Sequence, residues 1–187
     1  MKGVVFNLLE EAVTRSFGAD MWDDLVEASA VSGSYSSLGN YPDAEIEALV
    51  SAAGQALNLQ RDAVLRWFGN NAIPILSELY PEFFRVADIH TFLAGINNII
   101  HAEVRKLYPG AVCPHLRLKA DGDADLVMDY LSSRQMFALA QGFIEGTAAW
   151  FDQPMRLEHL ACTQSGDPHC TFRIRWDVAA TPDAAAA

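Results

Sequence analysis

The chain has 187 residues, of which 51% are hydrophobic and 10% aromatic, a composition that excludes a disordered or fibrous protein and is sufficient for one domain with a sizeable core. Thirteen basic residues against 24 acidic ones give a net charge of −11, which disfavours binding to nucleic acid or to an anionic membrane surface. The sequence has neither an uninterrupted apolar stretch of about 18 residues nor a secretory signal pattern, so we expect a cytoplasmic protein that does not enter a membrane.

The first part of the chain has the 3.6-residue apolar period of helices that each bury one face. Asp43 follows a proline and is expected to cap the helix that it begins. The residues Gly69-Asn-Asn71 are expected to break the pattern between two neighbouring helices. The predicted helices are 1–16, 20–29, 43–57, 62–68, 73–79 and 91–107.

The pattern changes after Pro109, where short alternating runs predict strands. Ser132, with Gln135 three residues later, has the spacing of a capping box that would open a helix reaching about Trp150. The predicted hairpins join 113–119 to 125–131 and 155–162 to 170–176. The tail, 179–187, has no core-forming residues and is expected to be disordered.

These elements predict an α+β fold in a single domain covering 1–178. A helical N-terminal lobe would take about 1–60. A C-terminal lobe, about 61–178, would hold an antiparallel sheet of roughly four strands that packs on two longer helices.

Tyr130, Ser132 and Arg134 stand two residues apart, so in an extended backbone they point the same way. A phenol, a hydroxyl and a guanidinium on one face are suited to binding paired carboxylates. Upstream, an amphipathic helix carries His101 and ends at a Pro-Gly pair. Haem coordinates an imidazole and carries two carboxylates, so these residues together indicate a haem site.

Each of these residues also has an ordinary structural interpretation. His101 could be a partly exposed or core-bonded histidine, and Arg134 an exposed residue at a helix start. Arg134 would oppose the helix dipole in that position, which favours an anion nearby. Ser132 could serve only as a helix cap.

The sequence resembles the haem nitric oxide/oxygen binding (H-NOX) family, the sensor domain shared by bacterial signalling proteins and soluble guanylate cyclase. The resemblance covers nearly the whole chain, and the YxSxR triplet lies about thirty residues after the helical histidine. It rests on the start Met1-Lys-Gly-Val-Val-Phe6, Arg66-Trp-Phe-Gly69, His101 with Leu107-Tyr-Pro109, Pro114, and Tyr130/Ser132/Arg134.

The resemblance implies haem b held between the two lobes, with His101 as the iron ligand and the triplet on the propionates. Pro114 resembles the family proline that presses on the haem, although it is also an ordinary strand-start proline. Nitric oxide would bind ferrous iron trans to His101, the iron–histidine bond would lengthen or break, and the helix would relax with the haem. The chain would have no catalysis of its own and would signal to a histidine kinase or a cyclic-di-GMP enzyme.

The expected gas selectivity depends on the distal side. Oxygen-binding members of the family have a tyrosine five residues beyond the motif arginine, and this position is Leu139 here. Leu139 also suits plain core packing. Two further family pocket positions correspond to Val5 and Leu9, both apolar. Without a distal donor the pocket should discriminate against O₂ while admitting nitric oxide and CO.

His159, Cys162 and Cys170 form a second group, with His-x₂-Cys-x₇-Cys spacing across the second hairpin. Two thiols and an imidazole could hold zinc, and the arrangement resembles that of some bacterial relatives that have a structural zinc here. A reversible disulfide between the two cysteines and inert thiols are the alternatives. This group supports a rival function, a thiol or zinc redox sensor. An enzyme such as a peroxidase ranks last, because Leu139, Val5 and Leu9 offer no distal acid or base.

Overall fold

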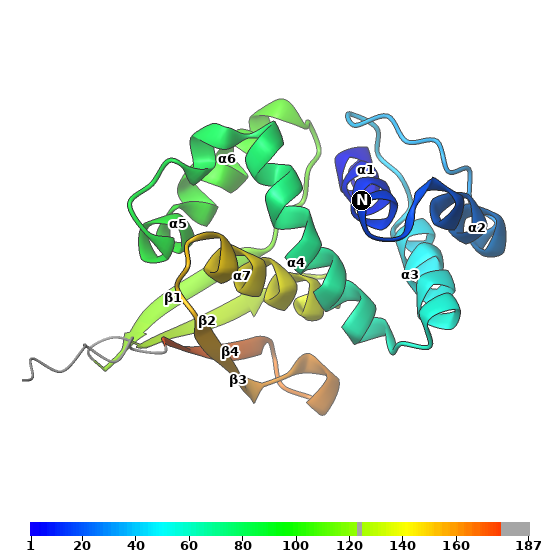
Figure 1. The fold of residues 1–187 in the computed structure, drawn as a ribbon. Coiled ribbons are helices and arrows are strands. Elements are labelled where there is room, and N and C mark those ends of the chain that lie inside the picture. The colour runs from blue at the N-terminus through cyan, green and yellow to red at the C-terminus, as the bar shows by residue number, and fades with distance from the viewer. Residues whose placement is uncertain (123–124, 177–187) are drawn as a thin grey trace, which may run out of the picture.

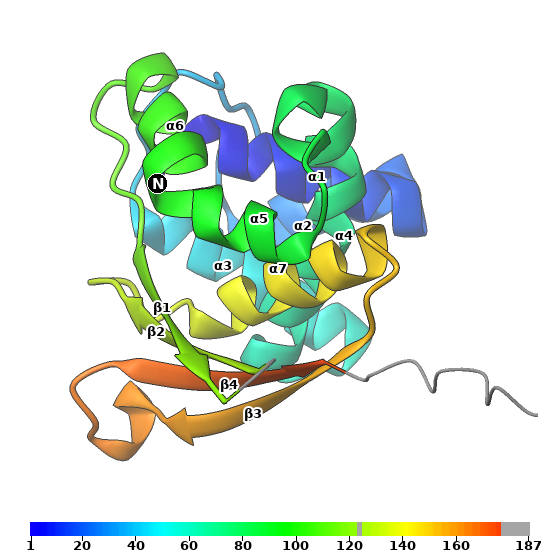
Figure 2. The same cartoon turned by 90° about the vertical axis from the view of Figure 1, so that its left-hand side faces the viewer.

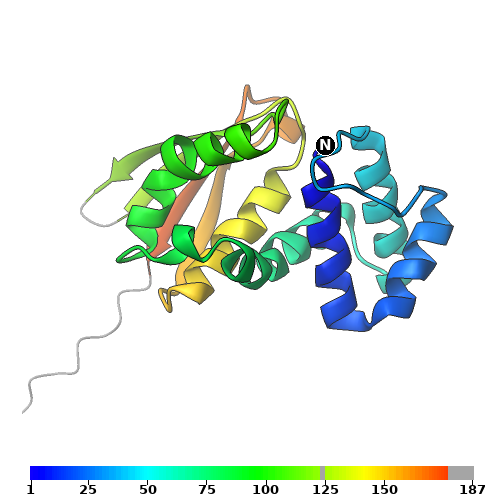
Figure 3. The same ribbon diagram turned by 90° about the horizontal axis from the view of Figure 1, so that it is seen from above.

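The computed structural model describes residues 1–122 and 125–176, and in it a bundle of helices stands beside a sheet that is covered by further helices (Figures 1 and 3). The helical N-terminal lobe and the mixed lobe with a four-stranded antiparallel sheet confirm the predicted α+β class. The predicted tail lies outside the described residues. The helices are α1 Gly3–Phe17, α2 Ala19–Ser29, α3 Asp43–Leu57, α4 Arg61–Leu79, α5 Ile89–Gly95, α6 His101–Leu107 and α7 Phe137–Trp150; the short turns are η1 Pro81–Phe84, η2 Ile96–Ile100 and η3 Thr163–Ser165; the strands are β1 His115–Asp121, β2 Asp125–Leu131, β3 Met155–Ala161 and β4 Cys170–Trp176.

The first lobe is built by α1, α2 and α3, whose apolar faces meet in one core with α4. Phe6 and Leu49 are fully buried there, as their helical spacing predicts. The N-cap prediction for Asp43 is wrong, because Pro42 holds the cap position and Asp43 is the first residue of α3. This carboxylate bonds to groups outside its own helix, as described below.

The prediction of two helices at 62–68 and 73–79 is wrong, because α4 is continuous through Gly69 and Pro74. Gly69 does not break the helix because it serves helix packing. A Cβ atom at Gly69 would collide with the backbone of α7 at Leu139, and one at Gly142 would collide with the backbone of α4 at Arg66. Glycine therefore lets α4 and α7 approach closely, and the helices bury a common face.

The predicted helix 91–107 is divided by a turn of π-helix, η2, between α5 and α6. The extra residue in this turn shifts the helical phase immediately before His101. Leu107, the last residue of α6, is 52% exposed.

The sheet has the order β1-β2-β4-β3, with all neighbours antiparallel, and α7 lies across one face of it (Figure 2). Met128, Phe172 and Ile174 are fully buried on this face, so the predicted alternation of β4 is confirmed. The capping-box prediction is wrong. α7 begins at Phe137, and the Ser132 hydroxyl accepts a hydrogen bond from the backbone N–H of Arg134 at 3.1 Å, which closes a local turn.

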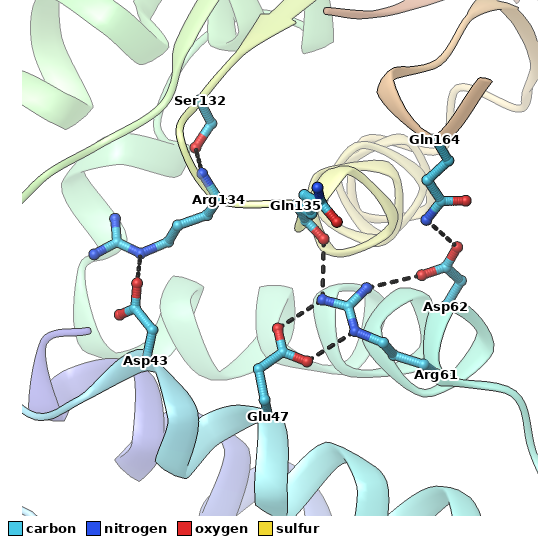
Figure 4. A network of polar contacts seen from close by, with 8 residues as sticks. All are labelled: Asp43, Glu47, Arg61, Asp62, Ser132, Arg134, Gln135 and Gln164. Atoms are coloured by element: carbon cyan, nitrogen blue, oxygen red, sulfur yellow. Dashed lines mark hydrogen bonds and ion pairs between the residues drawn. The ribbon is translucent and has the colours of Figure 1, made fainter. Parts of the chain in front are cut away.

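Polar contacts join the lobes beside this turn (Figure 4). Arg61, at the start of α4, donates to both carboxylate oxygens of Glu47 in α3 and to the carbonyl of Gln135. Arg134 reaches Asp43 in the same region. In the described ranges, none of the helices combines the length and the apolar character needed to cross a bilayer.

Candidate functional site

A cavity of about 340 Å³ lies between the two lobes, bounded by the start of α1, by α4, α6 and α7, and by β2. Most of its wall is apolar, which suits a flat hydrophobic ligand that must be kept from water. The apolar wall includes Val4, Val5, Leu8, Ile73, Leu76, Phe83, Phe92, Leu93, Ile96, Ile100, Val104, Met136, Leu139, Phe143 and Ile144. The polar groups at its edge therefore decide how a ligand is held.

His101 lies in the wall of this cavity. Its Nδ1 atom is buried and has no hydrogen-bond partner among the described residues. Burial lowers the pKa of His101 to about 4, and the charge of Arg105 acts in the same direction. The imidazole is therefore neutral at pH 7, which is the form that coordinates a metal ion. A buried ring nitrogen without a partner is costly, and metal ligation would satisfy the ring.

The position of His101 is set by Asn97, which sequence reasoning missed. The Asn97 side chain donates to the carbonyl of Leu116 and accepts from its backbone N–H at 3.1 Å. This two-way bond fixes the π-helical turn against β1, one turn before His101. The sequence signal was weak, since an Asn in a helix predicts no particular partner.

Tyr130, Ser132 and Arg134 all line this same cavity, as their alternate spacing predicts. Tyr130 is buried at the end of β2, and burial raises the pKa of its phenol, while Ser132 and the Arg134 charge act against that rise. The phenol is therefore protonated and can donate a hydrogen bond. Pro114 also lies in the wall, next to His101.

The Arg134 guanidinium is held in place by two contacts at the cavity edge. Its Nε donates to Asp43 at 2.7 Å, and its Nη1 donates to the carbonyl of Val112 at 3.0 Å. Nη2 has no hydrogen-bond partner within 1–122 and 125–176, so it remains available to an anion. The other oxygen of Asp43 accepts from the terminal amine of Met1. Burial raises the pKa of Asp43, but Arg134 and this amine lower it more, so the net shift is downward.

The expected distal positions are placed as follows. Val5 and Leu139 line the cavity, whereas Leu9 is buried in the core of the first lobe and Leu8 takes a place in the wall. Two phenols, Tyr80 and Tyr108, also line the cavity; sequence reasoning missed Tyr80 and used Tyr108 only as part of the family motif.

The hydroxyls of Tyr80 and Tyr108 lie 2.5 Å apart and hydrogen-bond to each other. Burial raises the pKa of Tyr80, and the bond to Tyr108 adds to the rise. The pair joins the end of α4 to the end of α6, so both hydroxyls contribute to a structural contact.

The zinc site expected from His159, Cys162 and Cys170 is not assembled. No group of three ligating side chains occurs in the part of the chain that the structure describes. The His159 ring packs edge-on against Phe172, and its Nε2 lies 3.0 Å from Gln141 Oε1, so the ring points to α7. The sulfur atoms of Cys162 and Cys170 lie 3.9 Å apart.

The residues around the cavity fit haem. A partly buried, neutral imidazole, whose Nδ1 has no hydrogen-bond partner among the described residues, faces an apolar cavity. At the cavity edge, Arg134 has an unused donor and Tyr130 is a protonated phenol. Haem has these same parts, an iron that takes imidazole, an apolar macrocycle and two carboxylates.

Comparisons with known proteins agree with this geometry. The model of a family described as haem-NO-binding matches residues 2–159. An H-NOX protein from S. oneidensis, solved in the Fe(II)NO ligation state, is 29% identical with a TM-score of 0.88, covering 95% of this chain and 100% of its own. The NMR structure of the SO2144 H-NOX domain from Shewanella oneidensis in the Fe(II)CO state is 29% identical with a TM-score of 0.87, covering 96% and 100%. The Fe(II) unliganded H-NOX protein from K. algicida is 27% identical with a TM-score of 0.84, covering 97% and 99%.

Proposed function

Because the chain belongs to the haem-NO-binding family of H-NOX gas sensors, we propose that it holds haem b in the cavity between its lobes and senses nitric oxide. The observation that carries this proposal is His101, a neutral, partly buried imidazole whose Nδ1 has no partner among the described residues and which faces an apolar cavity. When bound there, haem would supply a ferrous iron with an open position for a diatomic gas.

Different residues of the cavity would bind different parts of the haem. His101 would ligate the iron, the apolar wall would exclude water, and Tyr130, Ser132 and Arg134 would bind propionate. Asn97 would keep His101 in register through its bonds to β1. Since His101 is the first residue of α6, a change at the iron would be transmitted to this helix.

The cavity wall supports selectivity for nitric oxide and CO over O₂. Val5 and Leu139 offer no hydrogen-bond donor, and the Thr147 hydroxyl donates to its own helix at Phe143. Tyr80 and Tyr108 bond to each other, so one of the two phenol protons is used in that bond and the other phenol keeps its O–H. Bound O₂ is more polar than bound nitric oxide and depends more on a donor, so the apolar positions Val5 and Leu139 favour nitric oxide.

The output would pass to a separate protein, for which a histidine kinase or a cyclic-di-GMP enzyme is our proposal. We propose no catalytic activity for the chain, because Val5 and Leu139, at the expected distal positions in the cavity wall, offer neither an acid nor a base. We do not propose the thiol or zinc redox sensor as a second function of Cys162 and Cys170, since the described residues assemble no zinc site.

The test is the optical spectrum of the reduced, haem-loaded protein. We expect the Soret band to shift on addition of nitric oxide and of CO, and no long-lived oxygenated spectrum in air-saturated buffer. A protein that does not take up haem would overturn the proposal as a whole. A long-lived oxygenated spectrum would overturn the nitric oxide assignment and leave haem binding intact.

A further inference from the structure

Lys2 is a lysine buried at the edge of the cavity, with 7% of its surface exposed. Its Nζ donates to the carbonyls of Leu38 at 2.6 Å and of Pro109 at 3.2 Å. No carboxylate within 1–122 and 125–176 lies at ion-pair distance from it. A buried charge is normally paired with an opposite one, so an ammonium bonded only to neutral carbonyls is an incomplete arrangement.

The local charge balance points the same way. Two cations, the Arg134 guanidinium and the terminal amine of Met1, share one carboxylate, Asp43, and Lys2 directly follows Met1 in the chain. Asp43 already accepts from Arg134 and from that amine. The adjoining helix α1 has no acidic residue in its first turn to offset its dipole. This edge of the cavity therefore carries an excess of positive charge that the described side chains do not neutralise.

An ammonium group has three N–H donors, and two of them are used by Leu38 and Pro109. The third is available to a ligand in the cavity. We propose that Lys2 is the counterion of one haem propionate, while the Tyr130, Ser132 and Arg134 group holds the other. This inference rests on the proposed function, and it assigns the two carboxylates of the ligand to two separate cations.

The arrangement also connects the ligand to the histidine helix. Pro109 lies just beyond the end of α6, and Leu38 belongs to the loop before α3. Lys2 would then bind one propionate, the helical lobe and the end of α6 at once, whereas Arg134 binds the segment at Val112.

The test compares haem with haem dimethyl ester, in which both carboxylates are blocked. Wild-type protein and Lys2→Gln are loaded with each, and transfer to an excess of a haem scavenger gives the dissociation rate. We expect Lys2→Gln to speed the loss of haem about tenfold, because a charge-assisted hydrogen bond is removed, and to leave the loss of the ester nearly unchanged. Lys2→Arg should restore most of the difference.

The matched control is Lys106→Gln, since Lys106 is 69% exposed and pairs with Glu103 on the surface of α6. It should change neither rate. If Lys2→Gln speeds the loss of haem and of its ester equally, Lys2 acts only through its bonds to the two carbonyls. This outcome, or an unchanged rate of haem loss, would overturn the Lys2 inference and leave the proposed function intact. Failure of wild-type protein to take up haem would overturn the proposed function and this inference with it.

Discussion

The Asp43 carboxylate accepts a hydrogen bond from Nε of Arg134 at 2.7 Å, which joins the first residue of α3 to the segment between β2 and α7. The two residues are 91 positions apart in the chain. Because Nε is committed to Asp43 and Nη1 to Val112, the guanidinium plane is fixed before a ligand arrives. Asp43 thus acts as a positioning residue for Arg134.

The first prediction concerns haem retention through this pair. Arg134→Ala should lower haem affinity by about one to two orders of magnitude, because a charge-assisted bond worth about 1.5 to 3 kcal/mol is lost. Asp43→Asn should have a smaller effect in the same direction, because Nη2 is kept but less well oriented. Haem transfer rates measure both effects, and Arg15→Ala, an exposed arginine paired with Glu78, is the control. A larger effect for Asp43→Asn than for Arg134→Ala would contradict the positioning role.

The second prediction concerns the iron ligand. His101→Gly should fail to hold haem in buffer alone and should regain it with added imidazole, which fills the space of the missing ring. The measurement is the Soret band with and without imidazole. His115→Ala, at an exposed histidine that starts β1, should retain the wild-type band. An unaltered band in His101→Gly without imidazole would refute the assignment.

A third prediction concerns stability in acid, and it depends on Asp129, whose side chain is 5% exposed. Burial raises its pKa, but hydrogen bonds from Arg117, Thr171 and Lys119 lower it more, to about 2. Because the folded-state pKa lies below the unfolded value, Asp129 stabilises the fold fully above about pH 4, and this contribution disappears as the pH falls toward about 2.

The matching experiment is urea unfolding of wild type and Asp129→Asn. We expect the variant to lose about 2 kcal/mol at pH 7, and the difference between the two proteins to narrow as the pH falls below about 4. Asp24→Asn, at an exposed position of α2, should have the same unfolding free energy as wild type, both at neutral pH and in acid. A difference that does not depend on pH would mean that the carboxylate charge is not the cause.

The last prediction concerns the thiols of Cys162 and Cys170, 3.9 Å apart. A disulfide oxidant such as oxidised glutathione should join them, with two protons and two electrons passing to the oxidant. Burial raises the pKa of the Cys162 thiol, so the reaction should be slow at pH 7 and faster at higher pH. Intact mass and peptide mapping follow the bond. Cys113→Ser should leave the reaction unchanged, and a wild-type product linked through Cys113 would contradict the prediction.

Local patterns in the sequence were sufficient for much of the fold. The spacing of apolar residues predicted α1, α2, α3 and the strand alternation of β4, because each pattern depends only on which face of an element is buried. Tyr130, Ser132 and Arg134 reach one cavity, although only Tyr130 lies in β2 and the chain turns between Ser132 and Arg134. His101 could be singled out because it is the histidine of an amphipathic helix.

Tertiary structure decided the rest, because a local pattern does not identify the partner of a residue. Gly69 was read as a helix break, but packing against α7 makes it part of a continuous helix. Asp43 was read as a cap, but a cation from 91 residues away takes its carboxylate. His159 was a candidate zinc ligand by its spacing from Cys162 and Cys170, but its ring packs against Phe172 and its Nε2 lies next to Gln141.

The sequence by itself therefore determined the fold class, the family resemblance and the candidate site residues that line the cavity. Only the folded chain decided which groups meet at the cavity edge. Lys2 illustrates the difference, since a lysine near the start of a chain is expected to be solvated, and its burial depends on Leu38 and Pro109, which come from distant segments. Long-range packing brings those carbonyls together, and no period in the sequence records it.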